Sequence, residues 1–227
     1  MAAVVATPLV KSSKPQVLLV PWDPASPAHV QRLVQQRIAC GWDHEAVEGW
    51  KAGQESGKSN LQWIVSTLLR FCLRSSEDFD HLPQLLDDSD PEKDAKLRKH
   101  AEAYPQEQEP LLDSAISFGG QSRTIPSPRR TFTPVGHISL GRGPTDYKTS
   151  GFAQNAEGLY WISNFYVSRA LQGSGLGSAA MDTVENLAIS EPLCAKTLAM
   201  NAINKDDPDR EEKYKALGLT IPPASGS

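Results

Sequence analysis

A glycine-rich turn is the part of this sequence whose residue types and spacing point most directly to chemistry. It runs Gln172-Gly173-Ser174-Gly175-Leu176-Gly177-Ser178 and begins five residues after the end of the segment Phe165-Tyr166-Val167. A turn of this kind exposes backbone N–H groups, and at the start of a helix these donors and the positive end of the helix dipole favour a phosphate or pyrophosphate. The missing Cβ atoms also allow close approach. The sequence therefore predicts an anion site here.

Two common nucleotide-binding turns do not fit this segment. A P-loop requires GxxxxGK followed by Ser or Thr, and this turn holds no lysine. A Rossmann turn requires GxGxxG, whereas the third glycine, Gly177, stands one position early and no second βαβ unit supports it. The pattern Gln172-x-x-Gly175-x-Gly177, five residues after Val167, instead resembles the pyrophosphate loop of the GNAT superfamily of acyl-CoA N-acyltransferases.

The resemblance covers the range from Val17 to Ile203 apart from an insertion, and the order of expected strands and helices agrees with it. It implies an α/β fold in which a mixed, mainly antiparallel central sheet is flanked by helices. The segment that begins at Val20 is also similar to uncharacterised fungal members. The chain ends at Ser227, where the family normally continues with a two-stranded hairpin, so the fold is expected to be C-terminally incomplete.

The resemblance also implies a reaction and a set of site residues. A primary amine would attack the thioester carbonyl of acetyl-CoA directly. Holding the amine and the thioester close together would supply most of the rate acceleration. The main chain of the signature strand would bind the pantetheine arm and polarise the thioester, the turn would hold the pyrophosphate, and an asparagine would lie near the cofactor. The residues at these positions are Phe165, Tyr166, Val167, Gln172, Gly173, Ser174, Gly175, Leu176, Gly177, Ser178 and Asn204.

Candidates for proton transfer are fewer. The family pattern of a tyrosine, three residues, a glycine and an apolar residue matches Tyr214 to Leu219, which makes Tyr214 the candidate acid for the leaving thiolate. A plain surface tyrosine is an equally open interpretation. Glu157, His137 and Asp146 are weak candidates for the general base, and a structural or solvated role is the favoured interpretation of each.

The elements that must position these residues follow from periodicity. We expect strands at 17–20, 62–65, 135–140, 159–167 and 197–203. Helices are expected after Ser26, with Pro27 at the first position and Val30, Leu33, Val34 and Ile38 at helical spacing, and after Asp43 as far as the glycines at 53 and 57. The helix after the glycine-rich turn places Leu176, Ala180, Val184, Leu187 and Ala188 on one face.

The domain organisation is a loose tail at 1–15, one domain at 16–221 and a short tail at 222–227. An acidic, proline-rich insertion at about 73–130 interrupts the domain and is expected to lie outside the core. Asp90-Pro91-Glu92 predicts the start of a helix that ends at Ala103. The two interpretations of this helix are a solvated helix on a loop and an acidic docking segment.

Composition excludes several classes. With 23 Lys+Arg, 27 Asp+Glu and a net charge of -4, the chain has no surplus of positive charge for a nucleic-acid backbone. The longest apolar runs fall far short of the roughly 20 residues of a membrane span. Three widely spaced cysteines and the lack of a recognisable signal peptide favour a cytoplasmic protein, with a nuclear one left open, and no metal cluster is visible.

Three functions follow from these observations. The first is an acetyl-CoA-dependent N-acetyltransferase that acts on a small-molecule or peptide amine. The second is a non-catalytic GNAT-like protein that binds CoA or serves as a scaffold after losing turnover with its C-terminal strands. The third is a soluble interaction protein that carries an acidic insertion and binds no nucleotide.

Overall fold

A five-stranded mixed sheet forms the centre of the molecule. The computed structural model describes residues 15–66, 91–142, 157–200, 211–212 and 215. The sheet has the order β1-β2-β7-β8-β9, in which β8 and β9 are parallel and every other pair is antiparallel. Its strands are β1 (Val17–Pro21), β2 (Ser59–Ser66), β7 (Gly136–Gly141), β8 (Leu159–Val167) and β9 (Thr197–Met200). The expected mainly antiparallel sheet flanked by helices is confirmed.

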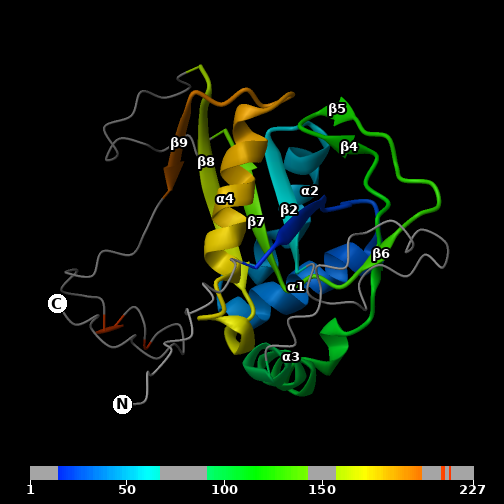
Figure 1. Ribbon diagram of the computed structural model, residues 1–227. Helices are drawn as coiled ribbons and strands as arrows, with labels where there is room; N and C mark the ends of the chain where they lie inside the picture. Colours follow the sequence, from blue (N-terminus) through cyan, green and yellow to red (C-terminus); the bar gives the residue numbers. More distant parts are fainter. Residues whose placement is uncertain (1–14, 67–90, 143–156, 201–210, 213–214, 216–227) are drawn as a thin grey trace, which may run out of the picture.

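Helices cover both faces of this sheet. Figure 1 shows α4 crossing one face, and α1 and α2 lie on the other. The helices are α1 (Pro27–Cys40), α2 (Val47–Glu55), α3 (Pro91–Ala103) and α4 (Leu176–Ile189), with short 3-10 turns η1 (His44–Ala46), η3 (Pro105–Glu107) and η4 (Arg169–Leu171). Two small ribbons pair β3 (Leu111–Leu112) with β6 (Thr131–Phe132) and β4 (Ser117–Phe118) with β5 (Gln121–Ser122).

Strand alternation divides the apolar side chains between two cores. The core under α4 contains Ile64, Val135, Ile138, Leu140, Tyr160, Ile162, Val167, Leu171, Leu176, Ala180, Val184, Ala188 and Leu193. The core under α1 and α2 contains Val20, Trp22, Leu33, Val47, Leu61, Trp63, Val65, Leu111 and Phe132. The predicted apolar face of the helix after the glycine-rich turn therefore packs on the sheet, and the signature strand β8 is held against it.

The buried face of α1 differs from the one that its apolar residues predict. The residues that face the protein interior are His29, Arg32, Leu33, Gln36 and Arg37, which recur at helical spacing but are mostly polar. Ile38, at the end of the predicted apolar series, is 58% exposed. This polar stripe contacts β2 through His29 and Trp63 and β7 through Gln36 and His137.

Several local predictions about helix ends also need correction. Ser26 and Asp43 make no side-chain cap hydrogen bond, and Asp43 pairs instead with Arg37 at 3.3 Å. Gly41 does end α1, with a left-handed φ of 92°. Gly53 lies inside α2 rather than ending it.

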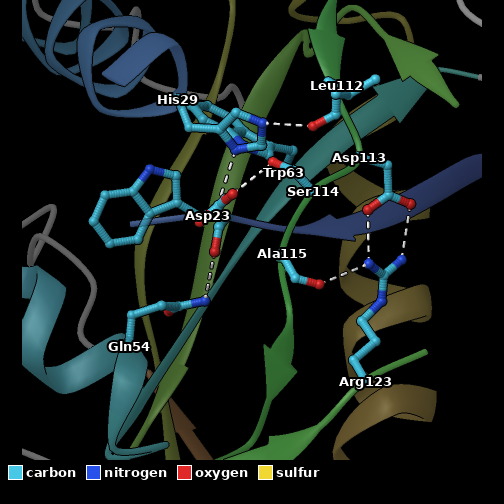
Figure 2. Close-up of polar contacts among 10 residues, drawn as sticks. Asp23, His29, Gln54, Trp63, Leu112, Asp113, Ser114, Ala115 and Arg123 are labelled. Atoms are coloured by element: carbon cyan, nitrogen blue, oxygen red, sulfur yellow. Dashed lines mark hydrogen bonds and ion pairs between the residues drawn. The ribbon is translucent and has the colours of Figure 1, made fainter. Parts of the chain in front are cut away.

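The insertion was expected to lie outside the core, and for its second half this expectation is wrong. Leu111 is 3% and Ala115 is 2% exposed, and Figure 2 shows how polar contacts tie their neighbours to the sheet. His29 Nδ1 accepts hydrogen bonds from Asp23 N at 3.0 Å and Trp63 Nε1 at 3.1 Å, and its Nε2 bonds Leu112 O at 2.9 Å. Because Nδ1 accepts two N–H groups, the proton of this neutral ring is on Nε2.

The same segment is braced by a second set of contacts in Figure 2. Arg123 donates to both carboxylate oxygens of Asp113, at 2.7 and 2.8 Å, and Ser114 Oγ donates to Asp23 Oδ2 at 2.5 Å. Asp113 is 6% exposed, so the paired charges are largely removed from water. The helix predicted from Pro91 to Ala103 is confirmed as α3.

Strand β8 contains one irregularity that changes which side chains face each core. Its register with β7 runs from His137↔Tyr166 to Ser139↔Ser163, so three steps on β8 match two steps on β7. Asn164 in this bulge has a positive φ of 50°. The extra residue reverses the alternation, and it places Tyr166 beside His137, with ring centres 5.5 Å apart, while Val167 joins the core under α4.

Candidate functional site

The glycine-rich turn connects β8 to α4 through a tight backbone path. After η4 the chain passes through Gly173 and Gly175, whose φ angles are +77° and +81°, and α4 then begins at Leu176. Only glycine adopts such angles without strain, so the two positions explain why the turn needs glycines. Gly177 has no positive φ and belongs to the first turn of the helix.

The start of α4 presents backbone donors without protein acceptors. The first hydrogen bond of the helix runs from Ala179 N to Gly175 O at 3.0 Å. The N–H groups of Leu176, Gly177 and Ser178 precede it, and among the described residues they have no acceptor. Three adjacent donors at a helix N-terminus are a favourable arrangement for binding an anion.

Two polar side chains of the turn brace its backbone. Gln172 Nε2 donates to Val167 O at 3.2 Å, and Ser174 Oγ donates to Leu171 O at 2.5 Å. Both bonds tie the turn to the carbonyls of residues just before it, so these side chains fix its path while the backbone N–H groups at the start of α4 remain available.

The space around the turn is unequal on its two sides. A Cβ atom added at Gly173 would meet no atom within 4 Å, whereas one at Gly175 would lie 3.1 Å from Pro15 Cδ. At Gly177 it would lie 3.6 Å from Phe165 Cζ, an ordinary contact. Pro15 therefore closes the side at Gly175, and the side at Gly173 is open.

The signature strand reaches this turn with its bulge. Phe165 is 36% exposed, whereas Tyr166 and Val167 are buried. Asn164 and Phe165 fall in the break of the register, so they have no paired residue in β7. The described pairing with β9 extends from Leu159 to Ile162, which leaves the end of β8 with no described strand on that side.

The predicted proton-transfer residues have different outcomes. Asn204, Tyr214 and Asp146 lie outside the described residues. Glu157 is 92% exposed and forms an ion pair with Lys196 at 3.2 Å. His137 is fully buried, and burial lowers the pKa of its ring well below the usual value, with Arg37 adding to the effect.

A buried polar cluster beside Tyr166 was not predicted. Gln36 Nε2 donates to Glu107 Oε2 at 3.2 Å and to Pro134 O at 3.3 Å, so Gln36 Oε1 accepts from His137 Nδ1 at 2.8 Å. His100 Nδ1 bonds Ser168 Oγ at 2.6 Å. These side chains come from α1, α3, η3 and β7 and meet at the end of β8.

Burial controls the charge state of this cluster. Glu107 is 1% exposed, and desolvation raises the pKa of its carboxyl despite the hydrogen bond from Gln36 and the charge of Arg32. Desolvation also lowers the pKa of His100, which the charge of Arg32 lowers further. Both effects favour neutral side chains at this place. The spacing of apolar residues could not have revealed this cluster, because its members are polar.

Among the described residues, no group of three or more His, Cys, Asp or Glu side chains is arranged to hold a metal ion. No described helix combines the length and apolar character that crossing a membrane requires.

Comparison with known proteins adds the family. The acetyltransferase (GNAT) family matches residues 84–218, more than half of the chain. No curated protein sequence matches. Among solved structures, a Trypanosoma brucei acetyltransferase aligns with 93% of this chain and 98% of its own at 12% identity and a TM-score of 0.36, a similarity too low to support a functional argument. The family match spans β8, the glycine-rich turn and α4, and the chain belongs to the acetyltransferase (GNAT) family.

Proposed function

We propose that this protein is an acetyl-CoA-dependent N-acetyltransferase that acts on a primary amine. The observation that carries the proposal is the group of N–H donors at Leu176, Gly177 and Ser178, which have no acceptor in the described part of the chain and lie at the start of α4, after the glycine-rich turn that follows β8. A pyrophosphate fits these donors because it is an anion with several acceptor oxygens. The family supports acyl transfer as the reaction class.

The residues of the turn would hold the cofactor through their main chain. Gly173 offers open space for a phosphate, and the N–H groups at the start of α4 offer hydrogen bonds and the positive end of the helix dipole. Asn204, further along the chain, is proposed to lie near the same group. When bound, acetyl-CoA supplies an acyl group that is activated as a thioester.

The end of β8 is proposed to position the reacting groups. Phe165 has no paired residue in β7, so its main chain is available to bind the pantetheine arm and polarise the thioester. The strand is fixed on both sides of this point by its pairing with β7, which supports an exact placement of donor and acceptor. Tyr214 is proposed as the acid for the leaving thiolate. The acceptor is a small-molecule or peptide amine.

Thermal unfolding with and without acetyl-CoA tests the cofactor site. A ligand at about 100 times its dissociation constant stabilises the native state by about 2.7 kcal/mol. We expect an upward shift of the melting temperature with acetyl-CoA. A folded sample that shows no shift at saturating ligand would refute the site.

A charge substitution in the turn makes this test specific. In Gly177→Glu the backbone stays unstrained and the Cβ has ordinary contacts, so the fold is retained, and an acidic residue in the first turn of a helix is favourable. Its carboxylate would repel the phosphates, so the acetyl-CoA shift should disappear. Gly49→Glu is the matched control, because Gly49 is exposed in α2 and a Cβ added there would meet no atom of another described element within 4 Å. It should shift as the unaltered protein does.

Release of free CoA thiol in the presence of a panel of small and peptide amines tests turnover. Amine-dependent release supports the transferase. Binding of acetyl-CoA without release for any amine would favour the non-catalytic CoA-binding alternative.

A further inference from the structure

Helix α3 packs directly against η4, the turn from which the glycine-rich segment departs. In Figure 1 it lies at the end of the sheet where α4 begins. The contact includes the buried hydrogen bond of 2.6 Å between His100 Nδ1 and Ser168 Oγ. Both side chains are nearly inaccessible, at 3% and 1% exposed, so the bond is shielded from water.

A second contact joins Tyr104, the residue that follows α3, to Tyr166 in the signature strand. The side chain of Tyr104 lies near the Tyr166 hydroxyl, and the ring of Tyr104 lies 5.4 Å from the ring of His100. Tyr166 and Ser168 flank Val167, the last residue of β8. His100 in α3 and Tyr104 just after it therefore contact the chain on both sides of Val167.

The fixed position of Val167 extends into the glycine-rich turn. Val167 O accepts the hydrogen bond from Gln172 Nε2, and Ser168 N donates to Val135 O at 2.9 Å. Leu171 N in turn donates to Ser168 O at 2.9 Å. A displacement of Ser168 would thus be transmitted to the turn within a few bonds, and glycines at 173 and 175 give the turn little stiffness of its own.

We propose that α3 is a positioning element for the phosphate-binding turn, and that His100 is the residue through which it acts. This inference rests on the proposed function of the turn. The sequence of α3 indicated only a solvated helix or a docking segment, whereas its contact with η4 indicates a structural role. His100 holds Ser168, and Ser168 with Val167 sets the path of the turn toward α4.

Calorimetric titration of CoA tests the inference. We expect His100→Ala and Ser168→Ala each to weaken CoA binding about tenfold. The double variant should bind CoA no more weakly than either single variant, because both substitutions remove the same hydrogen bond. His100→Asn should recover binding to within about threefold, since the Asn amide reaches the position of Nδ1. Gln54→Ala is the control, because Gln54 is buried and hydrogen-bonded to Trp22 O and Leu61 N in another part of the core.

The control separates positioning from general destabilisation. Gln54→Ala should lower the melting temperature without changing CoA affinity, whereas His100→Ala changes both. Unchanged CoA affinity in folded His100→Ala and Ser168→Ala would overturn the inference. If the unaltered protein binds no CoA, the proposed function fails instead, and hydrogen exchange of 172–178 in the ligand-free protein still decides the positioning role. Faster exchange in Ser168→Ala supports that role, and unchanged exchange refutes it.

Discussion

The three glycines of the turn should respond to the same substitution in three different ways. Gly173 and Gly175 have left-handed φ angles, and Gly177 does not. A Cβ at Gly173 meets open space, at Gly175 it lies 3.1 Å from Pro15 Cδ, and at Gly177 it makes an ordinary contact of 3.6 Å. Alanine at Gly173 therefore tests backbone strain alone, and alanine at Gly175 tests strain together with crowding. Alanine at Gly177 introduces neither effect.

The expected changes in unfolding free energy follow from these geometries. Gly173→Ala should lose about 1 to 2 kcal/mol from the left-handed backbone. Gly175→Ala should lose about 1 kcal/mol more, because Pro15 must also move. Gly177→Ala should gain about 0.5 kcal/mol, because alanine reduces the entropy of the unfolded chain at a compatible helical position. The predicted order of stability is Gly177→Ala, unaltered protein, Gly173→Ala, Gly175→Ala.

Urea denaturation measures these changes, provided that the m-value stays constant. The variant Pro15→Ala is the control for crowding, because the smaller side chain lacks the Cδ that Gly175→Ala would meet. In that background Gly175→Ala should cost no more than Gly173→Ala does. Equal gains from alanine at Gly173 and Gly177 would refute the left-handed path of the turn, and equal costs at Gly173 and Gly175 would refute the contact with Pro15.

Three further predictions concern Gly136 in β7, the buried Glu107 and the buried histidines. Gly136→Ala should destabilise the fold by about 3 kcal/mol in urea titration, because its Cβ would lie 2.1 Å from Tyr166 O, and a change below about 1 kcal/mol would contradict this packing. Glu107→Gln should raise the urea midpoint at pH 7, since burial raises the pKa of the carboxyl and disfavours its charge, and a lower midpoint would instead show that the ionised form is needed. In the Glu107→Gln background, stability should fall as pH falls below about 6.5. Burial lowers the pKa values of His29, His100 and His137, so the unfolded chain takes up more protons there; urea midpoints that stay level from pH 7.5 to 5 would refute this.

Local sequence determined the signature strand, the turn and the helix after it. The strand at 159–167 was predicted with the bounds that β8 has, and α4 begins at Leu176 as expected. These elements were predictable because periodicity, β-branched and aromatic residues, and glycine spacing act over a few neighbouring residues. The family resemblance rested on this segment together with the order of strands and helices from Val17 to Ile203.

Tertiary structure alone decided the polar side of the site. The buried face of α1 could not be identified from apolar periodicity, because four of its five buried residues are polar. The bonds His100 to Ser168, Gln36 to Glu107 and Gln36 to His137 join residues 68, 71 and 101 positions apart. A polar side chain can be buried only where its hydrogen-bond partners meet it, and those partners are brought together by the folded sheet and not by the neighbouring sequence.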